Sequence, residues 1–239
     1  MTEEDADKML RAACDFQGKS LQAREVCRDQ YRRAETSEQN TLRILIDGQI
    51  ALLAEKVVDR IECTSPAISY QIGVSASFIR SHFIVADSIL QGDLLESLII
   101  IRKQLESLAR LHEIDSKPLE KLAKKVPNIQ NVLKGEAGRL YGHLSEVAHY
   151  STPRVGELLD VVERGELIGP SLLPTYQPER SGACFDMNCF IAVYFIGWMV
   201  EKLPTWYPGY DNAREMQRLG DTILLALRCG VINVPNSPA

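Results

Sequence analysis

The sequence predicts an all-α protein built as an antiparallel bundle of helices. In the long segments between residues 37 and 229, large apolar residues recur three and four positions apart, which is the spacing of one helix face. No segment has the strict alternation of polar and apolar residues that marks a half-buried strand. The connections between the periodic segments are short, and short connections make consecutive helices antiparallel neighbours.

The expected elements begin with a charged segment. Residues 3–35 hold many charges and few large apolar groups, so we expect one or two exposed helices that form an arm. Residues 165–182 contain three glycines and three prolines and are expected to form the one long loop. We therefore expect an arm at 1–36, a single bundle domain at 37–232 and a frayed tail at 233–239. Apolar periodicity predicts helices at 37–62, 66–90, 93–113, 117–125, 130–150, 154–164, 183–203 and 211–229.

Capping residues and prolines set the boundaries of these helices. The Thr-Ser-Glu sequence at 36–38 is typical of a capped helix start. Pro66 and Pro118 fit the first turn of a helix, where proline costs no hydrogen bond. The Ser-Thr-Pro sequence at 151–153 is expected to stop the helix that begins near residue 130.

The composition is that of an ordinary globular protein. Hydrophobic residues make up 45% of the 239 positions and charged residues 25%, which is enough for one substantial core. The formal net charge is −5, so a nucleic-acid contact would have to use a local basic patch. The most apolar stretch, 189–200, has 12 residues, whereas a membrane span needs ~20. The sequence MTEEDADKML is acidic and lacks the apolar core of a signal peptide.

The six cysteines are scattered along the chain, and none forms a C-x-x-C pair. Zinc ligands come at short spacings, so we expect buried free thiols in a reducing compartment, the cytoplasm. The sequence also lacks a phosphate-binding glycine loop and a nucleophile elbow. We therefore expect no cofactor, no metal and no membrane partner.

Two charged residues interrupt the apolar face of the helix expected at 93–113. On a helical wheel, Arg102 and Glu106 fall inside the apolar arc, whereas Lys103 and Arg110 lie toward the polar side. A buried lone charge is costly, so the pair must be matched, hydrogen-bonded or open to a cleft. Arg before Glu at i,i+4 is the less favourable order, which indicates a further partner on another helix. The arc consists of Leu94, Leu95, Leu98, Ile99, Ile101, Leu105, Leu108 and Ala109.

The segment EAGRLYGHLSEVAHY at 136–150 is the candidate partner helix. Tyr141, Ser145 and His149 are spaced by four and follow one edge of its inward face. His143 lies on the opposite side beside two glutamates, an arrangement typical of a solvated face. The inward edge of this helix is therefore expected to face the charged pair.

Together the two helices predict a polar cluster of Arg102, Glu106, Ser145 and His149. Two interpretations stay open. The cluster is either a buried network that fixes helix register or a site that lines a cleft, in which case all four are candidate catalytic residues. His149 likewise is either a satisfied core residue or a group that titrates near neutral pH.

Two stretches of the sequence resemble a known group. SLIIIRKQLESLARL and, later, YGHLSEVAHYS resemble uncharacterised bacterial helical proteins with an R-x-x-x-E helix followed by a Y-x-x-x-S-x-x-x-H helix. That group is similar to the HEPN-like helical families, several of which are RNA-cleaving toxins or phage-defence effectors. The resemblance covers about residues 75–155. It implies a HEPN-like bundle with extra N-terminal and C-terminal helices.

The resemblance also implies a role for each residue of the cluster. His149 would act as general acid or base on a 2′-hydroxyl, and Arg102 would bind the phosphate. Glu106 and Ser145 would orient them. The Arg–His spacing of HEPN ribonucleases is not reproduced at 139–143, where an apolar leucine follows the arginine.

Two functions therefore remain, and whether the chain is an enzyme is left open. The favoured function is a non-enzymatic binding or interaction module, with a homodimer or another protein as partner. The aromatic segment 206–210 would be its exposed interface anchor, unless it only packs over the end of the bundle. The alternative is a HEPN-like RNA-cleaving or RNA-binding toxin or defence protein that uses His149 and Arg102. The basic stretch Lys117–Lys134 would hold the RNA, unless it is only a solvated helix face.

Overall fold

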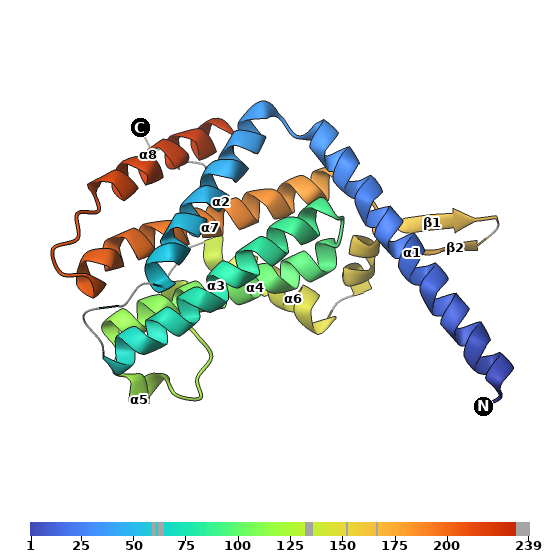
Figure 1. The fold of residues 1–239 in the computed structure, drawn as a ribbon, viewed down its shortest axis with the longest axis horizontal. Coiled ribbons are helices and arrows are strands. Elements are labelled where there is room, and N and C mark those ends of the chain that lie inside the picture. Colours follow the sequence, from blue (N-terminus) through green and yellow to red (C-terminus); the bar gives the residue numbers. More distant parts are fainter. Residues whose placement is uncertain (59–60, 62–64, 132–135, 152, 166, 233–239) are drawn as a thin grey trace.

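The computed structural model describes all residues except 59–60, 62–64, 132–135, 152, 166 and 233–239. Within the described residues, the expected all-α bundle is confirmed (Figure 1). The expected tail at 233–239 lies outside them. The α-helices are α1 (Glu3–Ala34), α2 (Ser37–Val58), α3 (Pro66–Leu90), α4 (Leu94–Ser116), α5 (Leu119–Leu122), α6 (Glu136–His149), α7 (Pro178–Trp206) and α8 (Ala213–Arg228). The short elements are the 3-10 helices η1 (Ile129–Asn131) and η2 (Pro153–Leu159) and the strands β1 (Val161–Arg164) and β2 (Leu167–Pro170).

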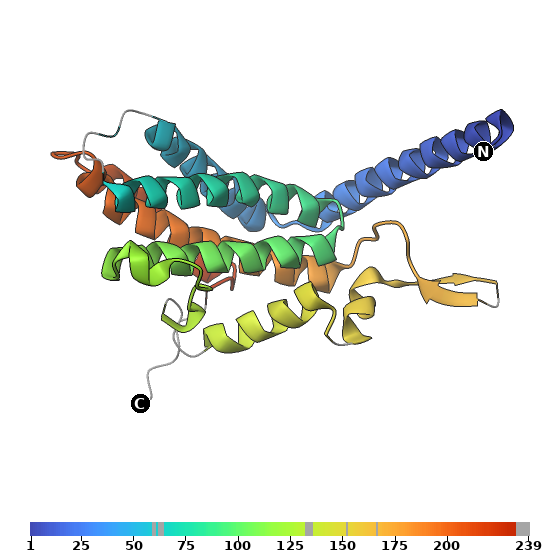
Figure 2. The same cartoon turned by 90° about the horizontal axis from the view of Figure 1, so that it is seen from below.

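Helix α7 is the centre of the bundle. Helices α2, α3, α4 and α8 pack against it, and Figures 1 and 2 show it running the length of the bundle. Its residue Phe195 stacks on Phe78 of α3, with ring centroids 3.9 Å apart and planes at 12°. By length and composition α7 is apolar enough to cross a membrane, but 67% of its apolar window is buried inside the protein. This burial favours the core helix of a soluble bundle over a membrane span.

Helix α1 packs on the bundle only through its C-terminal half. Cys27 and Tyr31 are buried, and α1 contacts α3 and α7 there. Arg24 adds an ion pair with Asp93 at the start of α4, with 2.8 Å between Nε and Oδ2. Residues 1–19 are all exposed, and Figure 1 shows this half of α1 extending past the bundle. The charged arm is therefore one continuous helix with two different environments.

The turn between α3 and α4 lies against α1 and requires a glycine. Gly92 has a φ of +78°, in the left-handed region that side chains disfavour. A Cβ atom at this position would lie 2.9 Å from the carbonyl oxygen of Thr175 and 3.0 Å from Sγ of Cys27. A side chain here would push away either α1 or the segment that leads into α7.

The helix predicted at 154–164 is found only in its first half, where the 3-10 helix η2 covers Pro153–Leu159, and the structure corrects its second half and the long loop predicted at 165–182. Strands β1 and β2 pair antiparallel around Gly165, which has a φ of +66°. The valines at 161–162 are β-branched and favour a strand, but four-residue strands are too short for their alternation to be read in the sequence. The predicted loop is shortened further because α7 begins at Pro178, where a first-turn proline is tolerated.

The aromatic segment 206–210 is not the exposed anchor that the sequence suggests. Trp206 is completely buried, and its Nε1 donates to Oε1 of Gln71 at 3.4 Å. The hydroxyl of Tyr207 donates to the carbonyl of Lys56. The segment therefore closes the end of the bundle, because its rings find apolar contacts and hydrogen-bond acceptors there.

Candidate functional site

The predicted polar residues meet where α6 packs on α4. Arg102 projects from α4 and contacts both Glu106, one turn further along the same helix, and two residues of α6. The two helices run in opposite directions (Figure 2), and two residues of α6 that lie about two turns apart reach the same arginine. The partners from α6 are Tyr141 and His149. The sequence prediction that α6 faces the charged pair agrees with these contacts.

Each nitrogen of the Arg102 guanidinium donates to a different group. Nε donates to Oε1 of Glu106 at 3.1 Å, and Nη2 donates to the hydroxyl of Tyr141 at 3.3 Å. Nη1 lies 3.1 Å from Nε2 of His149. The Tyr141 hydroxyl in turn donates to Oε1 of Glu106 at 2.8 Å, so Arg, Glu and Tyr form a closed triangle. The guanidinium also lies 5.3 Å from the centre of the Tyr141 ring.

The contact between Arg102 and His149 fixes which ring nitrogen of the histidine carries the proton. Arginine has donors and no acceptor, so Nε2 of His149 accepts the hydrogen bond. The neutral ring then carries its proton on Nδ1. His149 is exposed, and its ring therefore lies at the solvent side of the cluster.

The cluster is partly solvated, which corrects the expectation of a buried network. The side chains of Arg102 and Glu106 are 18% and 27% exposed. Burial disfavours the charged form of Arg102, but the hydrogen bond with Tyr141 and the charge of Glu106 outweigh it and raise the pKa of the guanidinium. The arginine is therefore a permanent cation held against a carboxylate at the edge of the helix interface.

Ser145 differs from the other three predicted residues. It is half-buried on α6 between Tyr141 and His149, but no hydrogen bond joins it to the cluster among the residues that the structure describes. Tyr141 takes the position that the sequence assigned to Ser145. The signal was present, because Tyr141 begins the same stripe spaced by four, and its longer side chain reaches across to Glu106.

A second charged pair on α4 was missed by the sequence analysis. Arg110, placed there on the polar side, is buried, and its Nη1 lies 3.4 Å from Oε2 of the buried Glu113. Nη1 also donates to the carbonyl of Leu122 at 3.3 Å, and Nη2 donates to the carbonyl of Lys125. The chain after α4 folds back over Arg110 and covers a face that the wheel assigns to solvent.

The described lysines of the basic stretch, at 117, 121, 124 and 125, lie away from the cluster. Lys117 pairs with Glu113 at 3.0 Å, and the three lysines of 121–125 are exposed, whereas Lys134 lies outside the described residues. Lys117, the C-cap of α4, lies 15 positions after Arg102, which is about 22 Å along a helix. The described lysines of the stretch and the candidate catalytic histidine therefore do not form one compact site.

A histidine–aspartate pair that the sequence analysis missed lies in the core. His82 is buried, and its Nε2 lies 2.8 Å from Oδ1 of Asp47. Its Nδ1 has no hydrogen-bond partner in the described part of the chain. The cavity beside it measures about 10 Å³, which is only about enough for one water molecule. A substrate has no access here, so the pair serves packing between α2 and α3.

The thiols and carboxylates offer little for metal chemistry within the described residues. No three His, Cys, Asp or Glu side chains gather there in a way that would hold a metal ion. Burial raises the pKa of the Cys184 thiol to about 12 and that of Cys189 well above its ordinary value, so both stay protonated.

In comparisons with protein-family models, curated proteins and solved structures, the chain matches none. The geometry of its own residues therefore carries the functional argument.

Proposed function

We propose that this chain is a non-enzymatic helical interaction module whose polar cluster holds α6 on α4. One observation carries the proposal: all three nitrogens of Arg102 already donate to protein groups. These contacts use three of the five N–H donors of the guanidinium, so a substrate phosphate would find only the second N–H of Nη1 and of Nη2, beside the carboxylate of Glu106. A closed hydrogen-bond network of this kind specifies one packing of two helices.

The partner that we propose is a second copy of the chain, bound through α1. Met9, Phe16 and Ala23 repeat every seven residues along this helix, and Ala6, Ala13, Ser20 and Cys27 fill the alternate positions. This is the spacing of a helix seam that packs against another helix. The same stripe that is buried at Cys27 is exposed at Met9 and Phe16. A second copy would continue a packing face that the bundle covers only in part.

The charges of α1 favour an antiparallel pair. Residues 3–18 hold five acidic and two basic residues, a net charge of −3, and residues 19–34 hold five basic and two acidic residues, a net charge of +3. Two antiparallel copies bring the acidic half of each helix beside the basic half of the other, whereas parallel copies place like charges together. We therefore propose a symmetric dimer with crossed arms.

Sedimentation velocity of the full chain over a range of concentrations tests this dimer. We expect a dimer for the natural chain and a monomer for Phe16→Glu, because a carboxylate in the seam would be desolvated. Val26→Glu is the matched control: Phe16 is 49% exposed and Val26 50%, but Val26 lies about 100° around the helix from Met9. A natural chain that sediments as a monomer throughout, or equal effects of the two variants, would rule out this interface.

The location that we propose is the cytoplasm, as expected for this use of cysteine. Cys14, Cys27, Cys184, Cys189 and Cys229 are all free thiols. Free buried thiols suit a reducing compartment. Fractionation of cells that express the full chain checks this, and recovery in the membrane fraction would contradict it.

An RNA-directed activity is the second candidate, and one observation favours it. His149 is exposed, and its Nε2 lies next to a permanent cation, as a general acid or base near a phosphate would. Incubation of the full chain with single-stranded and hairpin RNA tests it, with and without divalent metal. We expect no cleavage. Cleavage that is lost in His149→Ala, in a variant that melts at the natural temperature, would replace the first proposal.

A further inference from the structure

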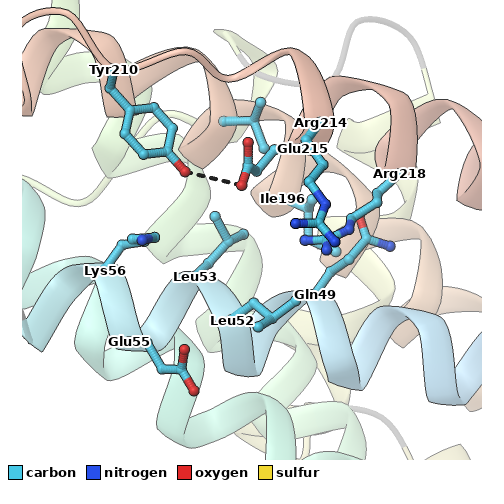
Figure 3. A pocket seen from close by; sticks show the side chains of 11 residues that line it. Gln49, Leu52, Leu53, Glu55, Lys56, Ile196, Tyr210, Arg214, Glu215 and Arg218 are labelled. Carbon is cyan, nitrogen blue, oxygen red and sulfur yellow. Dashed lines mark hydrogen bonds between the residues drawn. The ribbon is translucent and has the colours of Figure 1, made fainter.

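A separate cavity lies between α2 and α8, over α7, on the other side of the bundle from α6. It measures about 200 Å³. Leu53 and Ile196 form an apolar floor (Figure 3), and Val200 also lines the cavity. Pockets for drug-sized ligands usually measure ~300–1,000 Å³, so this cavity suits a smaller molecule.

Two arginines of α8 line this cavity together. Arg214 and Arg218 are one helical turn apart, and Figure 3 shows both guanidinium groups directed toward Gln49 of α2. Two like charges at i,i+4 destabilise a helix, so an anion that lies between the two arginines would stabilise α8. Planar guanidinium groups are well suited to hold two oxygens of such an anion at once.

Arg218 stands apart from the other arginines that are buried or half-buried. It is half-buried, yet within the described part of the chain no hydrogen bond or ion pair engages its side chain. A half-buried cation without an acceptor loses hydration and gains nothing in return. By contrast, the comparable arginines all have acceptors: Arg24 with Asp93, Arg28 with Asp87, Arg43 with Glu35, Arg102 with Glu106, Arg110 with Leu122, and Arg180 with Gln177.

The carboxylates of the cavity do not neutralise these arginines. Glu215 accepts a hydrogen bond from the hydroxyl of Tyr210 at 2.9 Å. Glu55 is exposed, and Figure 3 shows its carboxylate pointing away from the two guanidinium groups. Lys56 adds a third cation to the lining, with Nζ 5.7 Å from the centre of the Tyr210 ring. Three cations against two carboxylates leave the lining positive in a chain of net charge −5.

The walls of the cavity are held at a fixed distance. The side-chain amide of Gln49 donates to the carbonyl of Leu45 on its own helix and to the hydroxyl of Thr222 on α8, at 3.1 and 2.6 Å. Thr222 donates back to the carbonyl of Arg218 at 2.9 Å. This buried chain of hydrogen bonds fixes the spacing of α2 and α8, and a preorganised cavity binds a ligand at lower entropic cost.

We propose that this cavity binds a small phosphorylated molecule. Its phosphate is held between Arg214 and Arg218. Its short apolar part rests on Leu53 and Ile196. A phosphate monoester is chosen over a carboxylate because its second negative charge and third oxygen allow it to pair with both guanidinium groups at once.

Isothermal titration calorimetry on the full chain tests the proposal, with chloride used to match ionic strength. The probes are n-butyl phosphate, inorganic phosphate and butyrate. We expect n-butyl phosphate to bind more tightly than inorganic phosphate, because only the ester has an apolar part, and butyrate to bind most weakly. Arg218→Gln should weaken n-butyl phosphate binding about tenfold or more, since one charge-assisted pair is lost. Arg228→Gln, on the same helix but outside this cavity, is the matched control.

Three results would overturn the proposal. The first is the absence of heat from n-butyl phosphate in the natural chain beyond that of the chloride blank. The second is an equal affinity of Arg218→Gln and Arg228→Gln for n-butyl phosphate, which would mean that the phosphate associates with arginines in general. The third is butyrate binding as tightly as n-butyl phosphate. Thermal melts of the variants are run in parallel, and if Arg218→Gln melts early, Arg214→Gln replaces it with the same expected loss.

Discussion

Helix α4 carries two Arg–Glu pairs whose surroundings differ. The side chains of Arg102 and Glu106 are 18% and 27% exposed, and the groups around them are other side chains. Those of Arg110 and Glu113 are 7% and 6% exposed, and Arg110 donates to backbone carbonyls. One pair therefore joins two helices at a solvated edge, and the other ties down a loop inside the protein.

The difference teaches what a helical wheel can and cannot read. The wheel locates the face of α4 that meets other helices, and Arg102 does lie at the margin of that face. A helical wheel cannot predict where the chain that follows the helix will pack. The segment after α4 folds back so that the carbonyls of Leu122 and Lys125 cover Arg110, and this converts a nominally polar face into an interior.

The largest effect is expected from Arg110→Met. Removing this cation leaves the buried Glu113 with Lys117 as its one ionic partner among the described residues, and it removes a hydrogen-bond donor from the carbonyls of Leu122 and Lys125. Loss of one partner from a buried pair costs ~3–5 kcal/mol, and we expect the free energy of unfolding in urea to fall by about that amount.

The control for Arg110→Met removes the carboxylate as well. In the double variant Arg110→Met/Glu113→Leu no unpaired charge remains, so part of the lost stability should return. If the free energy of unfolding of Arg110→Met alone equals that of the natural chain, the pair contributes little to stability and the contrast with Arg102 disappears.

A smaller effect is expected from Arg102→Met. Its partners are partly hydrated, so the charges that remain after the substitution can be solvated, and the loss should be about 1–2 kcal/mol. Urea unfolding measured beside Arg110→Met gives the comparison directly. A loss from Arg102→Met that equals or exceeds the loss from Arg110→Met would mean that exposure does not distinguish the two pairs.

The sequence predicted the long elements well because their cues are local. The apolar periodicity and the first-turn Pro66 define α3, and α4 is found within a few residues of its observed ends. The hairpin at 161–170 was missed, because four-residue strands carry too few positions to show a period of two. Trp206 was read as exposed because its burial depends on Gln71 and other residues far away in the sequence.

The site was predicted in part for the same reason. The helical spacing correctly predicted that His149 and Arg102 lie close together, because each position follows from which face of its helix is turned inward. Spacing alone does not say which member of a stripe makes the hydrogen bond. Tyr141 was passed over for Ser145, although the tyrosine hydroxyl reaches farther and the serine hydroxyl does not join the cluster in the described part of the chain.

The smallest effects come from Tyr141→Phe and Ser145→Ala, and they sharpen the comparison within α6. Tyr141→Phe removes a hydroxyl that accepts from Arg102 and donates to Glu106, so the free energy of unfolding should fall by about 1 kcal/mol. Ser145→Ala removes no hydrogen bond to the cluster and should stay within about 0.5 kcal/mol of the natural chain. In an Arg102→Met background the loss from Tyr141→Phe should shrink, because the two residues act through the same network. If Ser145→Ala instead destabilises more than Tyr141→Phe, the serine and not the tyrosine links α6 to α4, and the original sequence prediction stands.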